Sequence, residues 1–148
     1  MEKPLVKVLK AHQRIPLPRY ESKGASGMDL RAFLESDIII QPMGRAKIPT
    51  GLRIEIPSGF EAQVRPRSGL AVNSGLTVLN SPGTIDSDYR GEIEIILVNL
   101  GSQDVIIKDG QRIAQLVIAP VCFAMIAEAG TLEESLRGSA GFGSTGMQ

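Results

Sequence analysis

Two arginines and a serine lie close together in the run Arg65-Pro66-Arg67-Ser68-Gly69-Leu70. Guanidinium groups present forked donors that suit phosphate oxygens. Residues 68–74 favour a short helix with Ser68 as its N-cap, and the free N–H groups at a helix start attract anions. The run therefore predicts either a phosphate site or an exposed turn with two solvated arginines.

A second group of polar residues lies in the run from Leu79 to Gly91, which is longer than the roughly two to five residues of a tight hairpin loop. Asn80 offers a donor and an acceptor to a planar amide edge, and Gly83 lets another group approach the backbone. Asp86 is suited to orient and deprotonate a water as a general base. The alternative is that Asp86 and Asp88 are turn residues that bond their own backbone.

The third candidate is the glycine-rich segment 138–146, GSAGFGSTG. Gly141, Gly143 and Gly146 match G-x-G-x-x-G, but the dinucleotide-binding use of this pattern needs a strand before it and a helix after it. A Rossmann site and a Walker A loop are both excluded here. The segment predicts a mobile tail whose N–H groups and hydroxyls wrap phosphates while Phe142 covers a base, or else a disordered end without a role.

Composition limits the kinds of partner that this chain can bind. Its 148 residues suit one domain. Lys plus Arg balances Asp plus Glu at 16 each, so the molecule as a whole has no long-range attraction to a nucleic acid or an anionic membrane, and we expect neither as a partner. No apolar stretch reaches the ~18 residues of a membrane span, and no secretory signal is evident, so we expect a cytoplasmic protein. With one Cys and one His, any metal must be a hard cation on oxygen ligands.

Short runs of alternating or β-branched apolar residues, each closed by a turn former, must position these groups. They predict an all-β sandwich or jelly roll with strands at Val6–Leu9, Asp37–Ile40, Leu52–Ile56, Phe60–Val64, Glu92–Val98, Val105–Lys108 and Arg112–Ile118. A second short helix is predicted at Thr131–Arg137, where Thr131 and Glu134 have capping-box spacing and Gly138 follows. From Gly138 onward the chain is expected to order only against something else.

Taken in order, these runs resemble the five signature motifs of the trimeric dUTPase family, and the spacing agrees along essentially the whole chain. The matching segments are Ala25–Ala32 (ASGMDLRA), Arg65–Ala71, Asn80–Ile93, Gly110–Leu116 (GQRIAQL) and Arg137–Gly146. The resemblance implies a distorted jelly-roll (β-clip) subunit with one short helix, assembled as a homotrimer with three shared active sites. It divides the chain into a β-rich domain, residues 1–136, and a flexible tail, residues 137–148, that closes a neighbouring site.

The resemblance also implies roles for individual residues. Asp86 and Ser68 would be catalytic, Tyr89 would lie against the deoxyribose, and Phe142 would stack over the uracil. Asp29 would support a Mg²⁺ site through water or indirect contacts. The substrate-binding residues implied are Arg67, Ser68, Gly69, Asn80, Gly83, Thr84, Ile85, Asp86, Tyr89, Gln115, Arg137, Phe142, Gly143, Ser144 and Thr145.

The activity implied is hydrolysis of dUTP to dUMP and pyrophosphate, with Mg²⁺ on the triphosphate and Asp86 activating a water for attack on the α-phosphorus. A dCTP deaminase is the nearest alternative, but such enzymes carry a Glu where this chain has Ile96, which cannot transfer a proton. Glu92 and Glu94 are expected to face away from the base. A non-catalytic nucleotide-binding module is the other alternative, and the presence of Asp86 and the tail argues against it.

Overall fold

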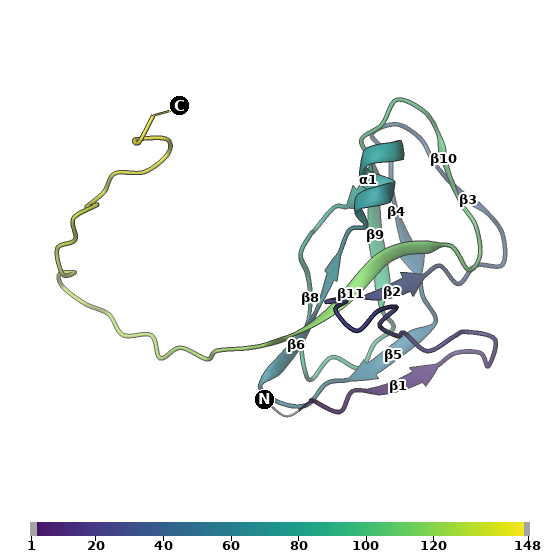
Figure 1. Cartoon of the computed structure of the whole chain (residues 1–148), viewed down its shortest axis with the longest axis horizontal. Helices are drawn as coiled ribbons and strands as arrows, with labels where there is room; N and C mark the ends of the chain where they lie inside the picture. Colours follow the sequence, from purple (N-terminus) through teal and green to yellow (C-terminus); the bar gives the residue numbers. More distant parts are fainter. Residues whose placement is uncertain (1–2, 147–148) are drawn as a thin grey trace.

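The computed structural model describes residues 3–146. Residues 1–2 of the predicted β-rich domain and residues 147–148 of the predicted tail lie outside the described part. Within it, the chain forms eleven short strands and one helix (Figure 1). The strands are β1 Lys7–Lys10, β2 Met28–Arg31, β3 Ile38–Ile40, β4 Arg45–Pro49, β5 Leu52–Glu55, β6 Phe60–Arg65, β7 Leu76–Val78, β8 Gly83–Ile85, β9 Glu94–Asn99, β10 Val105–Ile107 and β11 Arg112–Pro120. The prediction of an all-β fold with one short helix is confirmed.

All seven predicted runs overlap a strand; β9 and β11 have consecutive buried residues, and the shorter strands show alternating burial. In β5, for example, Leu52 and Ile54 are buried while Arg53 and Glu55 are exposed. The strands β2, β4, β7 and β8 were not predicted, and each has only three to five residues. So short a strand shows little alternation, and its pairing depends on neighbours distant in sequence.

The strands pair antiparallel in four small sheets that enclose one core. The largest has the order β2-β11-β6-β8, the next has the order β4-β9-β7, and β1-β5 and β10-β3 are two-stranded. Buried apolar side chains of these sheets pack together, including Leu30 on β2, Ile48 on β4 and Leu97 on β9, all 0% exposed. This packing fixes the strand ends and turns that carry the candidate site residues.

The helix α1 spans Ser68–Ser74, as predicted, but two expectations about helices are wrong. Arg67, not Ser68, occupies the N-cap position, and it makes no side-chain capping bond. Residues 131–137 are not helical, because this segment lies away from the core and a single turn without packing is unstable. No helix in residues 3–146 is long and apolar enough to cross a membrane.

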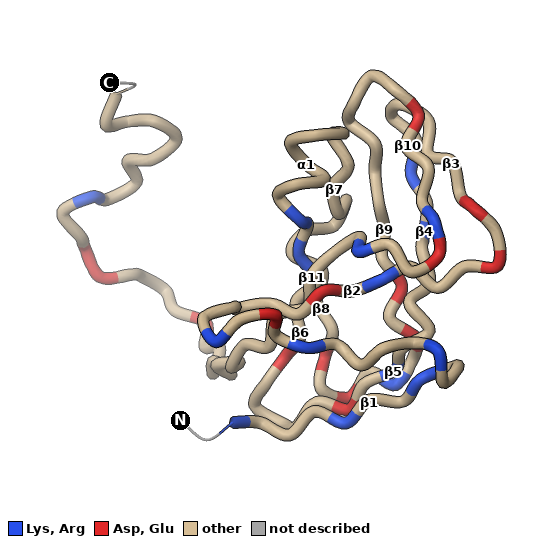
Figure 2. The backbone as a smooth tube through the Cα atoms, turned by 45° about the vertical axis from the view of Figure 1, so that its right-hand side comes forward, with Lys and Arg blue, Asp and Glu red and all other residues tan. Residues whose placement is uncertain are grey.

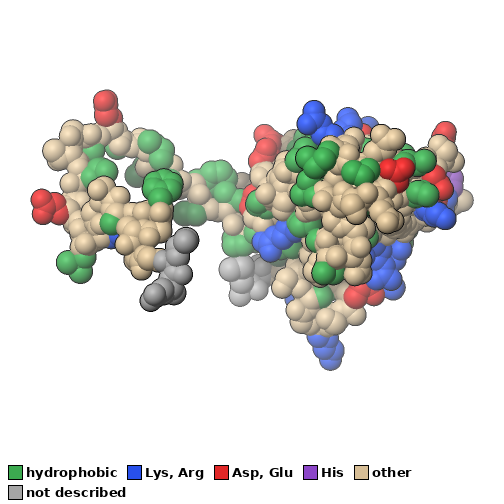
Figure 3. All heavy atoms as spheres, turned by 90° about the horizontal axis from the view of Figure 1, so that it is seen from above, with side chains coloured by type: hydrophobic (Ala, Val, Ile, Leu, Met, Phe, Trp, Pro, Cys, Tyr) green, Lys and Arg blue, Asp and Glu red, His purple; other side chains and the backbone are tan. Residues whose placement is uncertain are grey.

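After β11 the chain leaves the body and runs outward as an extended segment, residues 121–146, which we call the C-terminal arm (Figure 1). Almost all of its residues are exposed. Hydrophobic side chains lie along the segment that projects from the body in Figure 3, and Phe123, Met125 and Ile126 are 78%, 99% and 91% exposed. The arm thus begins well before residue 137.

Asn99, a fully buried polar side chain at the end of β9, ties three segments together. Its amide donates to the carbonyls of Ile40 (2.8 Å) and Gln103 (2.7 Å) and accepts from the N–H of Gly101 (2.9 Å). Asn99→Ala leaves these two carbonyls and the Gly101 N–H without partners. We therefore expect it to lower the free energy of unfolding by about 2–4 kcal/mol. Chemical denaturation at a fixed protein concentration measures the loss.

The matched control is Leu100→Ala, since Leu100 is the next residue and is 58% exposed. This control is expected to change the stability by less than about 0.5 kcal/mol. Equal effects of the two substitutions would show that the Asn99 bonds do not hold the fold together.

Candidate active site

Six of the predicted site residues line one cavity of about 220 Å³. Loop 79–82, strand β8 and the turn that follows it supply them, while β6 closes one side through Val64 and β9 another through Ile96. The six residues are Asn80, Gly83, Thr84, Ile85, Asp86 and Tyr89. The run that was predicted as a long loop therefore contains a strand, and that strand forms a wall of the cavity.

Gly83 allows this wall to lie close to its neighbours. Strand β8 pairs with β6 so that Gly83 faces Val64. A Cβ atom on Gly83 would lie 3.2 Å from the Val64 Cβ and 3.3 Å from the Asn80 Nδ2. The bare backbone therefore brings the amide of Asn80 against the strand, where the amide and the main chain can both meet a planar ligand.

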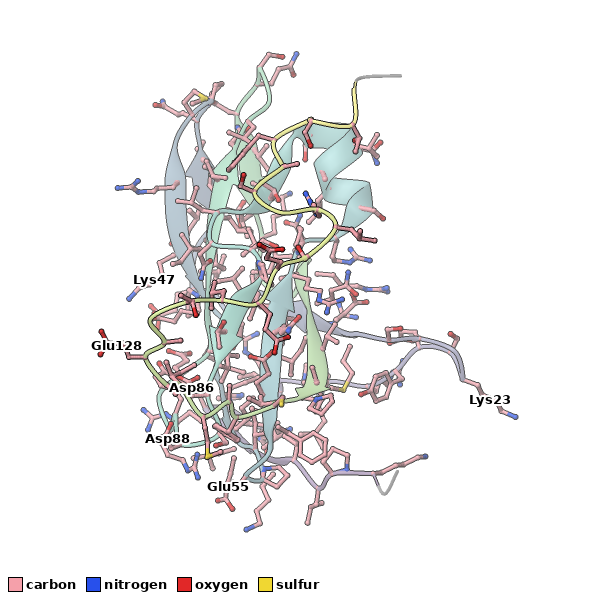
Figure 4. The ribbon with its side chains drawn as sticks, turned by 90° about the vertical axis from the view of Figure 1, so that its left-hand side faces the viewer. Lys23, Lys47, Glu55, Asp86, Asp88 and Glu128 are labelled. Carbon is pink, nitrogen blue, oxygen red and sulfur yellow. The ribbon has the colours of Figure 1, made fainter. Side chains whose placement is uncertain are left out.

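The turn after β8 presents Asp86 to solvent at the cavity. The Tyr89 N–H donates to the Asp86 carbonyl at 3.1 Å, which closes the turn. No hydrogen bond or ion pair within residues 3–146 involves the Asp86 carboxylate, so it does not bond its own turn. Figure 4 labels Asp86 and Asp88 close together on this turn, with Lys47 on the same side of the body. The Asp86 carboxylate is therefore free to bind a water.

Three charged residues that the sequence reasoning left out of the site also line the cavity: Lys47, Glu92 and Glu94. Glu92 and Glu94 were expected to face away from the base, but both residues border the cavity. Glu94 Oε2 pairs with Lys47 Nζ at 2.8 Å and raises the pKa of Lys47, while Glu92 Oε1 accepts the Gly51 N–H at 2.7 Å. Residues 94 and 96 point to the same face of a strand. The sequence comparison that placed Ile96 beside the base therefore also implied that Glu94 lies on the side of the base.

A second cluster gathers at the junction of α1, β2 and β11, where Figure 2 shows basic positions beside acidic ones. Asp29 lies between two guanidinium groups, with Oδ1 3.0 Å from Arg67 Nε and Oδ2 3.3 Å from Arg112 Nη1. Gln115 donates from Nε2 to the Pro66 carbonyl at 3.0 Å. Two arginines against one carboxylate leave this cluster with a net positive charge, which suits an anion.

Strand β11 explains why residues so far apart in sequence meet in this cluster. Gln115 faces Asp29 across the pairing with β2 and Arg65 across the pairing with β6. Strand β11 therefore brings Asp29 on β2 next to the end of β6. Arg67 follows β6 in the chain, and the exposed Ser68 and Gly69 come directly after it. Gln115 and the Arg67 run thus come together as a unit.

The predicted site residues on the arm join neither group within the chain. Figure 1 shows the arm far from the body; the arm crosses in front of the body only in the projection of Figure 4. Arg137 donates from Nε to the Ala140 carbonyl of the arm itself at 2.7 Å, and Phe142 is fully exposed. The arm residues concerned are Arg137, Phe142, Gly143, Ser144 and Thr145. The structure thus has three separate groups: a cavity, a basic cluster and an arm.

Comparisons with known proteins give the family. The dUTPase family model matches residues 13–146. Proteins named deoxyuridine 5'-triphosphate nucleotidohydrolase are 57% identical in Rhizobium etli, over 90% of this chain and 86% of that protein, and 54% identical in Bdellovibrio bacteriovorus, over 99% of each. The structure of Staphylococcus bacteriophage 80alpha dUTPase with dUPNHPP has a TM-score of 0.83 at 26% identity, over 97% of this chain and 99% of that one. The chain belongs to the dUTPase family.

Proposed function

We propose that this protein hydrolyses dUTP to dUMP and pyrophosphate. The observation that carries the proposal is the family match over residues 13–146, together with relatives at 54–58% identity that are named for this reaction. The cavity and the basic cluster supply the two kinds of site that the substrate needs. One takes a base and a sugar, and the other takes phosphates.

In the cavity, Asn80 and the main chain at Gly83 read the uracil edge. A planar amide edge needs a donor and an acceptor side by side, and these groups offer both within a space of about 220 Å³. Tyr89 lies at the mouth, 46% exposed, where its ring meets the deoxyribose. Thr84 and Ile85 complete the wall, so the base is selected by shape as well as by hydrogen bonds.

The phosphates bind at Arg67, Ser68, Gly69 and Gln115. In the free chain the guanidinium of Arg67 is occupied by Asp29, at 3.0 Å, and the amide of Gln115 by the Pro66 carbonyl, at 3.0 Å. A triphosphate competes with these partners, and forked charge-assisted bonds to phosphate are among the strongest hydrogen bonds in proteins. Asp29 and the Pro66 carbonyl thus hold these donors in the cluster until phosphate oxygens replace them.

The donor set fits Mg²⁺ that arrives on the triphosphate. Residues 3–146 contain no group of three or more His, Cys, Asp or Glu side chains arranged to hold a metal ion, and this ion is commonly bound through substrate phosphates, waters and one or two carboxylates. Asp29, at the phosphate cluster, would supply such a carboxylate and act on the ion through water. When bound, Mg²⁺ would neutralise phosphate charge.

A homotrimer with shared sites brings the three groups together. The cavity, the basic cluster and the arm are separate in one chain, and the arm exposes Phe123, Met125 and Ile126, apolar side chains that a subunit interface would cover. Each site then takes its cavity from one chain, its phosphate donors from a second and its tail from a third. Phe142 covers the uracil, and Arg137, Gly143, Ser144 and Thr145 meet the terminal phosphate.

The reaction in such a site is an in-line displacement. Asp86 accepts a proton from the water that attacks the α-phosphorus, while the bond from that phosphorus to the bridging oxygen of the β-phosphate breaks. The products are dUMP and pyrophosphate. Ser68 holds a phosphate oxygen near the α-phosphorus, and closure of the tail excludes bulk water and fixes the attack geometry.

A nucleotide panel tests the function. dUTP, dCTP, dTTP and UTP are each incubated with Mg²⁺ and then with EDTA, and pyrophosphate and ammonia are measured separately. Pyrophosphate from dUTP alone, abolished by EDTA, is the expected result. Ammonia from dCTP would instead identify a deaminase, and the absence of both products would favour a nucleotide-binding module.

A further inference from the structure

The hydroxyl end of the Tyr89 ring lies against the backbone of Gly91. A Cβ atom built on Gly91 would lie 2.5 Å from the Tyr89 Cζ and 2.9 Å from its Cε2, and closer still to the hydroxyl oxygen. Real Cβ atoms essentially never approach other heavy atoms within 3.0 Å. The observed ring position is therefore available only because residue 91 has no side chain.

The hydroxyl end of the ring is held as well. The Tyr89 hydroxyl donates to the Glu92 carbonyl at 3.0 Å. Glu92 is anchored in turn, since its carboxylate accepts the Gly51 N–H at 2.7 Å. The hydroxyl end of the ring is thus positioned by the bare backbone of Gly91 and by Glu92, which is bonded to a neighbouring turn.

Space, and not backbone conformation, is what residue 91 must provide. Several glycines of the chain have positive φ, among them Gly51 and Gly75, but Gly91 does not. Alanine therefore fits the backbone at position 91 without strain. Tyr89 is 46% exposed, so its ring can swing outward when a methyl group occupies the space beneath it. Gly91→Ala should fold normally and displace one side chain.

We propose that Gly91 is a positioning residue that sets the place of the Tyr89 ring at the cavity mouth and thereby excludes a ribose 2′-hydroxyl. The proposal rests on the proposed function, in which Tyr89 meets the deoxyribose. A ring held in this place leaves room for a deoxyribose and none for an additional hydroxyl group. A displaced ring opens that room, and UTP then enters.

The kinetic test compares kcat/KM for dUTP with kcat/KM for UTP. We expect Gly91→Ala to lower this ratio about tenfold, the scale on which a pocket separates ligands by one small group. Gly24→Ala is the matched control, because Gly24 has no positive φ and nothing within 4 Å of a built Cβ. It should leave the ratio unchanged.

A double substitution separates positioning from general damage. In a Tyr89→Ala background there is no ring to displace, so adding Gly91→Ala should change the ratio less than about twofold. If Gly91→Ala lowers the ratio equally with and without the ring, it acts by another route and the proposal fails.

A second measurement does not depend on turnover. The chain has two tyrosines and no tryptophan, so Tyr20→Phe leaves Tyr89 as the sole strong emitter. In that background, Gly91→Ala should increase acrylamide quenching of the tyrosine emission, because the ring moves into solvent. Unchanged quenching overturns the ring geometry, and increased quenching with an unchanged ratio overturns the role in selection. If the parent releases no pyrophosphate from dUTP, the proposed function fails while the quenching still decides the geometry.

Discussion

Asp86→Asn is expected to lower kcat for dUTP hydrolysis by about a hundredfold or more, the scale expected for the loss of a general base. Asparagine keeps the shape of the side chain but cannot accept a proton from water. The Asp86 carboxylate makes no hydrogen bond or ion pair within residues 3–146, so its replacement removes no contact that holds the turn. Pyrophosphate release under saturating dUTP measures kcat, and thermal unfolding checks that the fold is intact.

The control for this substitution is Asp88→Asn, which makes the same chemical change two residues away on the same exposed turn. It should retain nearly full activity. Equal losses at the two positions would mean that the charge of the turn matters and that Asp86 has no special role.

Removal of residues 138–148 is expected to give the second large effect, a loss of about a hundredfold in kcat, the scale of a small misplacement of reacting groups. The cavity and the Arg67 cluster remain, so dUTP affinity should change only by a modest factor. Residues 121–137 of the arm also remain, so the oligomer should have an unchanged number of subunits by light scattering. Dissociation of the truncated protein would make the tail a structural element.

Mixing two inactive chains tests whether one site draws on different subunits. Full-length Asp86→Asn has an intact tail and a defective cavity, while the truncated chain has the reverse. If the sites are shared, mixed oligomers contain cavities with Asp86 that are covered by an intact tail from another chain. Their activity should clearly exceed the sum of the two separate preparations. No recovery in verified mixed oligomers would place the cavity and the tail of each site on one chain.

The sequence predicted those strands whose burial is a local property. Strand β9 contains a short continuous apolar run, which is typical of a buried strand, and it was predicted to within two residues. Strand β8 has only Gly83–Ile85, and its existence depends on the pairing with β6, which no local pattern records. The opposite error occurred at residues 131–137, where capping signals without an apolar contact to the core did not make a helix.

The candidate site divides in the same way. Residue type pointed to Asn80 and Asp86, and the resemblance to the dUTPase family pointed to Tyr89. The structure gathers the three in one cavity, and their roles stay predictions. Glu92 and Gly91 were missed because their parts depend on packing. Glu92 accepts the Tyr89 hydroxyl through its backbone carbonyl, which any residue would have. Gly91 leaves space for the Tyr89 ring because it has no side chain. Neither contact follows from residue type or spacing.

The exposed end of the arm lies outside the folded core but, in the proposed function, is needed for turnover. Residues 138–146 contribute nothing to the buried core, and exposed glycine-rich backbone of this kind is a preferred substrate for proteases. If the tail closes the site as proposed, a preparation clipped there would melt like the intact protein and turn over substrate about a hundredfold more slowly. The intact mass of the chain, rather than its melting temperature, is therefore the quality criterion that predicts specific activity.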